Sequence, residues 1–244
     1  MIEKIVFADT IAAAAAALGP DSAFLGGGTE INRLGSSVKA TTAVSYKWPV
    51  PSIRQDNGYV LLPLGTTFQM VAESHACPAF LKEAALFMGS HQKREMATIA
   101  GNLYLHRDDS YITACLLACD AELELDDGSV LSASEYLERF DSLKGRIICS
   151  IKVCEDARIV QKRIAVTQES HAAITAAACP EAGFAMVKGT GLVKVDYSEV
   201  GCEDCVAKAI EKSHAVFRDD MFGTAEYKKY LCRTVLFDLF KEVR

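Results

Sequence analysis

Three consecutive glycines, Gly26, Gly27 and Gly28, stand between a short apolar stretch and a segment expected to be helical. Glycine adopts positive φ at little steric cost, and its missing side chain lets main-chain N–H groups come close to a ligand. A glycine turn at the start of a helix suits an anion, because unpaired N–H groups and the helix dipole both point there. The stretch FLGGGTEIN therefore predicts either a tight turn or a phosphate-binding turn.

The common nucleotide-binding fingerprints do not fit this turn. It lacks the G-K-S/T ending of a P-loop and the G-x-G-x-x-G spacing of a dinucleotide fold. A second segment, ATIAGNLYLHRDDSY, places Thr98, Gly101 and Asn102 shortly before Asp109 and Ser110. The two segments could together hold one extended ligand that carries phosphate, or they could be unrelated turns.

Charge and apolar runs limit the partners. Lys and Arg number 26 against 32 Asp and Glu, and no basic run stands out, so nucleic acid is not expected. The sequence shows no signal-peptide pattern and no apolar run near the roughly 20 residues that span a bilayer. These features predict a cytoplasmic protein without a membrane span.

Cysteines and histidines give no metal-binding pattern. Nine cysteines scattered among apolar neighbours predict reduced thiols. Cys202 and Cys205 have metal-ligand spacing, but no second pair lies near them in the sequence. The five histidines, His171 among them, are spread singly and are interpreted as surface or hydrogen-bonded structural residues. No metal site is predicted.

Helix and strand patterns alternate along the chain. An alanine-rich helix is expected from residue 11, with Asp9 or Thr10 as its N-cap, and buried strands are expected at 22–26 and 41–48. An Asn57-Gly58 turn precedes another strand. Further expected elements are two helices within 67–87 that are separated by Pro78, a helix running into a strand within 110–125, a strand at 146–153 and a strand pair around Gly189 and Gly191. A last helix is expected at 224–243, with Tyr227, Leu231 and Val235 on its buried face.

With these elements in place, the sequence resembles the FAD-binding subunits of the molybdenum hydroxylases, the family of xanthine dehydrogenase and aerobic carbon monoxide dehydrogenase. Leu25 to Glu30 resembles the family's first glycine motif, and Thr98 to Asn102 resembles its T-I-G-G-N motif. LGTTFQMVAES, LLACDAELEL and FGTAEYKKYL resemble three further family segments in the family order. The branch that looks most similar is set beside purine catabolism.

The resemblance implies that FAD is the cofactor and that the two glycine-containing turns hold its diphosphate and ribityl chain. Tyr104 could shield the flavin ring or fill core, and Arg163 falls where the family often has a lysine. The residues implied in cofactor binding are Leu25, Gly26, Gly27, Gly28, Thr29, Glu30, Ile31, Thr98, Gly101, Asn102, Tyr104, Asp109, Ser110 and Arg163.

The implied fold is α+β, of the two-subdomain FAD-binding (PCMH/VAO) type with a small C-terminal domain of sheet and helices, as in carbon monoxide dehydrogenase flavoprotein subunits. The expected divisions are an N-terminal α/β subdomain at 1–56, a second FAD-binding subdomain at 57–158 and a C-terminal domain at 159–244. FAD is expected in the crevice between the first two.

The implied function is electron transfer within a xanthine dehydrogenase-like complex. FAD would relay electrons from iron–sulfur clusters to an acceptor such as NAD or a ferredoxin, and no side chain is expected to act as a catalytic group. The implied partners are a molybdopterin-binding large subunit and a 2Fe–2S small subunit. Three departures from the family pattern, namely Ala100, Tyr111 and a shortened C-terminal domain, motivate an alternative function as a flavin-free structural scaffold in a related multi-subunit oxidoreductase.

Overall fold

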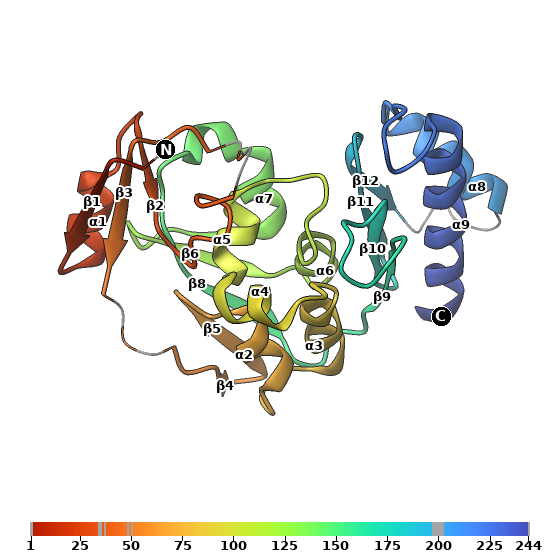
Figure 1. Cartoon of the computed structure of the whole chain (residues 1–244). Helices are drawn as coiled ribbons and strands as arrows, with labels where there is room; N and C mark the ends of the chain where they lie inside the picture. Colours follow the sequence, from red (N-terminus) through yellow and green to blue (C-terminus); the bar gives the residue numbers. More distant parts are fainter. Residues whose placement is uncertain are drawn as a thin grey trace.

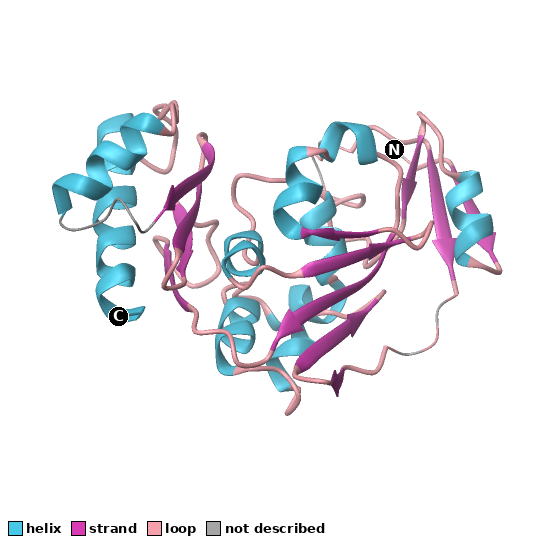
Figure 2. Cartoon of the chain, turned by 180° about the vertical axis from the view of Figure 1, so that it is seen from behind, coloured by secondary structure: helices cyan, strands magenta, loops and turns pink. Residues whose placement is uncertain are grey.

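The chain folds into three β-sheets that follow one another along the sequence (Figure 1). The computed structural model describes residues 2–33, 36, 38–47, 49, 51–196 and 203–243. The first and third sheets lie at opposite ends of the molecule, and the second sheet lies between them with its helices (Figures 1 and 2). Two of the described helices, α8 and α9, cover the far side of the third sheet.

The first sheet is parallel, with the strand order β1-β3-β2. Its elements are β1 (Lys4–Ala8), α1 (Ile11–Ala17), β2 (Ser22–Phe24) and β3 (Thr42–Tyr46). The hydroxyl of Thr10 accepts a hydrogen bond from the amide of Ala13, so Thr10 is the N-cap of α1 as expected. Strand β2 ends directly before the glycine turn.

The helix expected after Glu30 is not present in the described residues that follow it. Residues 29–33 form hydrogen-bonded turns instead, in which the amide of Asn32 donates to the Gly28 carbonyl and that of Arg33 to the Glu30 carbonyl. The side chains of Arg33 and Ser36 both bind the Glu30 carboxylate, which favours a compact turn over helix continuation. The prediction of a helix dipole at the first turn is therefore wrong.

The second sheet is antiparallel, with the order β4-β5-β8-β6-β7. Asn57 and Gly58 have positive φ angles of 52° and 81° and form the expected turn before β5. The strands are β4 (Arg54–Asp56), β5 (Tyr59–Pro63), β6 (Glu122–Leu125), β7 (Val130–Ser132) and β8 (Ile148–Cys154). The helices are α2 (Phe68–Glu73), α3 (Ala79–Leu86), α4 (His91–Met96), α5 (Ile99–Tyr104), α6 (Thr113–Ala118), α7 (Ala133–Glu138) and a 3-10 turn, η1 (Phe140–Leu143).

The start of α5 is fixed to the body of the second sheet. Thr98 forms an isolated β-bridge with Thr67, the residue that caps α2. The amide of Phe68 donates to the Ala97 carbonyl, and the amide of Ile99 donates to the Thr66 carbonyl. The second glycine-containing turn is thus held from both sides by main-chain hydrogen bonds.

The third sheet is antiparallel, with the order β12-β11-β10-β9. Its elements are β9 (Val160–Ile164), β10 (Ile174–Ala178), β11 (Ala182–Val187), β12 (Gly191–Asp196), α8 (Glu203–Lys212) and α9 (Ala225–Val243). Both faces of β10 and β11 are buried. Phe184 and Met186 join the core of the second sheet, whereas Ala185 and Val187 pack with α9. No described helix is both long and apolar enough to cross a membrane.

The buried face of α9 differs from the expected one by one position. Tyr227 is 46% exposed, whereas its neighbour Lys228 is fully buried. The buried face continues through Cys232, Val235 and Leu236, which keeps helical spacing from Lys228. The expected position of Tyr227 in the core is therefore wrong, because the lysine occupies the inward position at the start of the helix.

Candidate functional site

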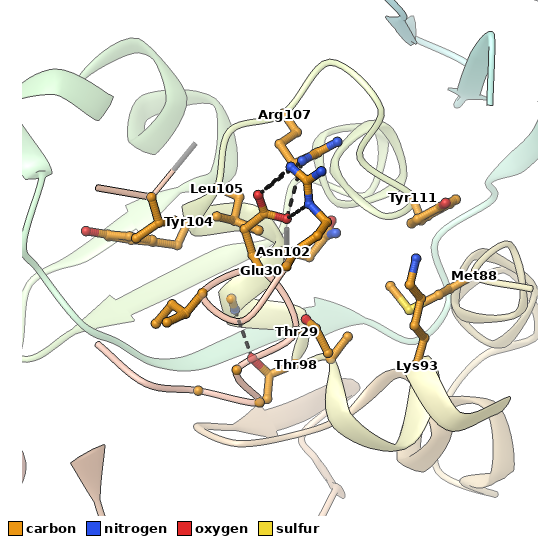
Figure 3. Close-up of a pocket in the computed structure, with 18 of the residues that line it drawn as sticks. Thr29, Glu30, Met88, Lys93, Thr98, Asn102, Tyr104, Leu105, Arg107 and Tyr111 are labelled. Carbon is orange, nitrogen blue, oxygen red and sulfur yellow. Dashed lines mark hydrogen bonds and ion pairs between the residues drawn. The ribbon is translucent and has the colours of Figure 1, made fainter. Parts of the chain in front are cut away.

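A cleft lies between the first glycine turn and α5 (Figure 3). It is partly open to solvent. Most of the residues implied in cofactor binding line it: Gly26, Gly27, Gly28, Thr29, Glu30, Ile31, Thr98, Gly101, Asn102, Tyr104 and Asp109.

The first turn presents unpaired main-chain donors. Within the described part of the chain, the amides of residues 26–31 donate no hydrogen bond, whereas the preceding Leu25 amide donates to the Val44 carbonyl. Gly28 has a φ angle of 72°, a conformation that side chains disfavour. Main-chain N–H groups without internal partners are suited to an anionic ligand.

The first two glycines of the turn have different surroundings. A Cβ atom on Gly27 would lie 1.4 Å from the Met96 carbonyl oxygen, so this glycine lets two segments of main chain pass in contact. A Cβ atom on Gly26 would lie 3.1 Å from the Thr98 hydroxyl oxygen, in the space where the two turns face each other. The close packing of Gly27 on residue 96 places both turns on one cleft.

A chain of hydroxyls orients Asn102. The Ser110 hydroxyl donates to Asn102 Oδ1 at 2.7 Å and lies 2.5 Å from the Thr113 hydroxyl. Because Ser110 uses its single proton on Asn102, Thr113 acts as the donor to Ser110. This arrangement leaves the Asn102 amide nitrogen as a donor at the cleft, with Ser110 buried behind it.

Arg107 links the two sides of the cleft (Figure 3). Its Nε and Nη2 atoms lie 2.7 Å from the two oxygens of Asp109, and its Nη1 lies 3.3 Å from Glu30 Oε2. Burial alone would raise the pKa of Asp109, but the hydrogen bonds and charge of Arg107, together with the charge of Lys188, lower it to about 2. Asp109 therefore acts as an ionised anchor.

The two ends of the cleft differ in chemistry. Tyr104 and Leu105 lie at one end, and Met88, Lys93 and Tyr111 lie at the other (Figure 3). Within the described residues Lys93 has no ion-pair partner, so its ammonium group is free to meet an anion in the cleft.

Three of the implied residues do not line the cleft. Leu25 precedes the turn, Ser110 lies behind Asn102, and Arg163 lies on β9 with its guanidinium carbon 5.7 Å from the centre of the Tyr111 ring. Each of the three contacts or adjoins a lining residue.

Sequence reasoning missed several residues of the cleft. Lys93, Arg107 and His171 are not among the residues implied in cofactor binding, yet all three line the cleft. His171 Nδ1 lies 2.8 Å from Asp109 Oδ2, and burial lowers the pKa of the histidine against the opposing effect of that carboxylate. The adjacent Arg107-Asp108-Asp109 charges were the available signal. No clustered set of metal-ligating side chains occurs in the described residues, and Cys202, one of the two cysteines with metal-ligand spacing, lies outside them.

Comparison with known families identifies the family of the chain. The family model for the FAD binding domain in molybdopterin dehydrogenase matches residues 3–155. The chain belongs to this family. Its cofactor is FAD, and it is a flavin-binding member of the molybdenum hydroxylase oxidoreductases.

Relatives and solved structures extend the match along the chain. The uncharacterized protein YgfM of Escherichia coli K12 is 25% identical over 91% of this chain and 88% of its own length. Carbon monoxide dehydrogenase from Oligotropha carboxidovorans matches with a TM-score of 0.77 and 19% identity over 100% of this chain and 97% of that chain. Quinoline 2-oxidoreductase from Pseudomonas putida 86 matches with a TM-score of 0.76 and 14% identity over 100% and 96%. The expected α+β flavoprotein-subunit fold is confirmed.

Proposed function

We propose that this chain is the FAD-binding subunit of a xanthine dehydrogenase-like complex, in which a molybdopterin-binding large subunit and a 2Fe–2S small subunit are its partners. Bound FAD would supply electron transfer to an acceptor such as NAD or a ferredoxin. The observation that carries the proposal is a single cleft faced by two turns, one with unpaired amides at residues 26–31 and one with an oriented Asn102.

The residues present fit a dinucleotide. The unpaired amides and Lys93 would hold the diphosphate, because both supply donors to an anion and neither is used within the described protein. Asn102 would donate to the ribityl or phosphate oxygens. Tyr104 and Tyr111 lie at opposite ends of the cleft (Figure 3) and would offer ring contacts to the cofactor. Glu30 and Asp109 are held by arginines and would keep the walls in place.

Ala100 does not block this arrangement. It is half-buried against the core of the second sheet and lines a smaller adjoining pocket, not the cleft itself. Tyr111, where the family has an acidic residue, lies in the wall of the cleft next to Arg163. These positions favour a flavin-binding chain over the flavin-free scaffold.

The test uses the complex purified through an affinity tag on this chain from its native host. We expect a yellow preparation that releases FAD on denaturation and contains molybdenum and iron. The isolated chain should bind FAD at least about tenfold more tightly than FMN, because FMN lacks the diphosphate and the adenosine. A chain that binds neither flavin, while still copurifying with other subunits, would replace the proposal with the scaffold function.

A further inference from the structure

A connected set of charged side chains runs from the first glycine turn to the C-terminal part of the chain. Glu30 is 12% exposed and contacts Arg107, whose guanidinium is paired with the 2% exposed Asp109. Lys188, at the end of β11, lies 3.3 Å from Asp109 Oδ2. Four side chains therefore connect the wall of the cleft to the third sheet.

The turn after β11 also binds the carboxylate of Asp108, the neighbour of Asp109. Lys188 Nζ lies 2.8 Å from Asp108 Oδ1, and the amide of Gly189 donates to Asp108 Oδ2 at 2.7 Å. Gly189 has a φ angle of 76°. This two-point contact fixes both the position and the direction of the segment that carries Arg107.

The same turn packs against Asp220 and against Lys228 of the C-terminal segment FGTAEYKKYL. A Cβ atom on Gly189 would lie 2.9 Å from Asp220 Oδ2 and 3.3 Å from Lys228 Nζ. Lys228 is fully buried and pairs with Asp220 at 2.6 Å. The turn therefore lies between the Lys228–Asp220 ion pair on one side and Asp108 on the other.

Lys188 and Asp108 do not themselves line the cleft. Loss of their contact would therefore remove no direct ligand contact, but it would release Arg107 and, through Glu30, the first glycine turn. Since the amides of that turn must converge on one anion, a small rotation of the turn weakens several hydrogen bonds at once.

We propose that Lys188 is a positioning residue for the cofactor, which couples docking of the third sheet on Asp108 to the shape of the first glycine turn. This inference rests on the proposed FAD-binding function. The contact acts through Arg107 and Glu30, and it makes FAD retention depend on a segment outside the matched family domain at 3–155.

The test compares Lys188→Met with Lys194→Met. Lys194 lies on β12 with 56% of its side chain exposed and 3.5 Å from Asp196, and it is a matched control on the same sheet. We expect the Kd for FAD to rise about tenfold for Lys188→Met, to stay near wild type for Lys194→Met, and to be largely restored in Lys188→Arg. The visible circular dichroism of bound FAD should change in Lys188→Met. The free energy of unfolding without FAD is also measured for wild type and Lys188→Met, because a merely structural role would act on that quantity.

A double-mutant cycle makes the test specific to the contact. Asp108→Asn should also weaken FAD binding, and Lys188→Met combined with Asp108→Asn should weaken it no further than the stronger single variant. Equal Kd values for wild type and Lys188→Met would overturn the inference while leaving the proposed function intact. Absence of FAD binding by the unaltered chain would overturn the proposed function and this inference together.

Discussion

At the residue scale, the neighbouring residues Gly26 and Gly27 differ in how much space a Cβ atom would have. Gly27 has no room for a Cβ atom because the Met96 carbonyl occupies that space. Its substitution would therefore disturb the chain as well as the ligand site. Gly26 faces the Thr98 hydroxyl across a gap in which a methyl group needs a shift of a few tenths of an ångström, so Gly26 gives the cleaner test of ligand contact.

We predict that Gly26→Ala raises the Kd for FAD by about tenfold, because the added methyl narrows the space between the two turns. Its free energy of unfolding without FAD should change by less than about 1 kcal/mol. Gly19→Ala is the control, since a Cβ atom there meets no atom within 4 Å. Titration of flavin fluorescence and urea denaturation measure the two effects. An unchanged Kd for Gly26→Ala would argue against a ligand between these turns.

Cleft residues differ in how far the sequence could predict them. The glycine turn, Thr98 and Asn102 were predicted from their motifs, because small residues and short polar side chains serve local geometry. Arg107 and Lys188 were not assigned to a shared role, because Arg107 is 77 residues from Glu30 and Lys188 is 79 residues from Asp109 in the sequence. Pairing over such distances depends on how the sheets pack, which composition and spacing do not specify.

At the element scale, α9 shows how tertiary packing shifts a helical pattern. Lys228 is buried at the inward position where a helical stripe would place an apolar residue, and its Nζ is satisfied by Asp220 and the Arg218 carbonyl. Asp220 retains 28% of its side-chain exposure. The two partners therefore differ in their access to water when the pair is broken.

We predict that Asp220→Asn destabilises the chain more than Lys228→Met. The asparagine variant leaves a fully buried ammonium group without its counter-charge, at a cost of about 3 kcal/mol, whereas Asp220 in the methionine variant can be hydrated and should cost about 1 kcal/mol. Urea denaturation of the FAD-free chain measures the order. The reverse order would mean that Lys228 is stabilised mainly by its buried aliphatic stem.

Elements with strong local signals agree with the sequence. Thr10 at α1, Pro78 before α3 and the Asn57-Gly58 turn act through backbone geometry within a few residues, so their effects were predictable. The helix prediction for the segment after Glu30 was wrong, because side-chain hydrogen bonds to that carboxylate favour a compact turn. Local helix propensity is overridden where one carboxylate accepts hydrogen bonds from several side chains.

At the scale of the whole molecule, Asp109 lies at the junction of three loop segments: its own, the first glycine turn after β2 and the turn after β11. It belongs to the loop before α6, contacts Lys188 beyond β11, and reaches the first turn through Arg107 and Glu30. An ionised carboxylate with 2% exposure at this junction makes the arrangement of the sheets sensitive to acid.

We predict a specific acid sensitivity from this residue. The pKa of Asp109 is lowered from 3.8 to about 2 on folding, so its contribution is complete above the unfolded value and is lost as the pH falls through the folded one. The difference in unfolding free energy between wild type and Asp109→Asn should therefore shrink by roughly 2 kcal/mol as the pH is lowered from about 4 to about 2. Denaturant titrations at each pH measure it. A difference that stays constant over this range would contradict the role of Asp109 as an ionised anchor.

Both faces of β10 and β11 are buried, and this limits where the chain can be truncated. Phe184 and Met186 belong to the same apolar core as the helices of the matched family domain. An excised fragment that stopped at residue 155 would expose that surface to solvent and would deprive Asp109 of Lys188. The smallest unit suited to expression is therefore set by shared interior packing, and protein produced for crystallisation or screening should extend through α9.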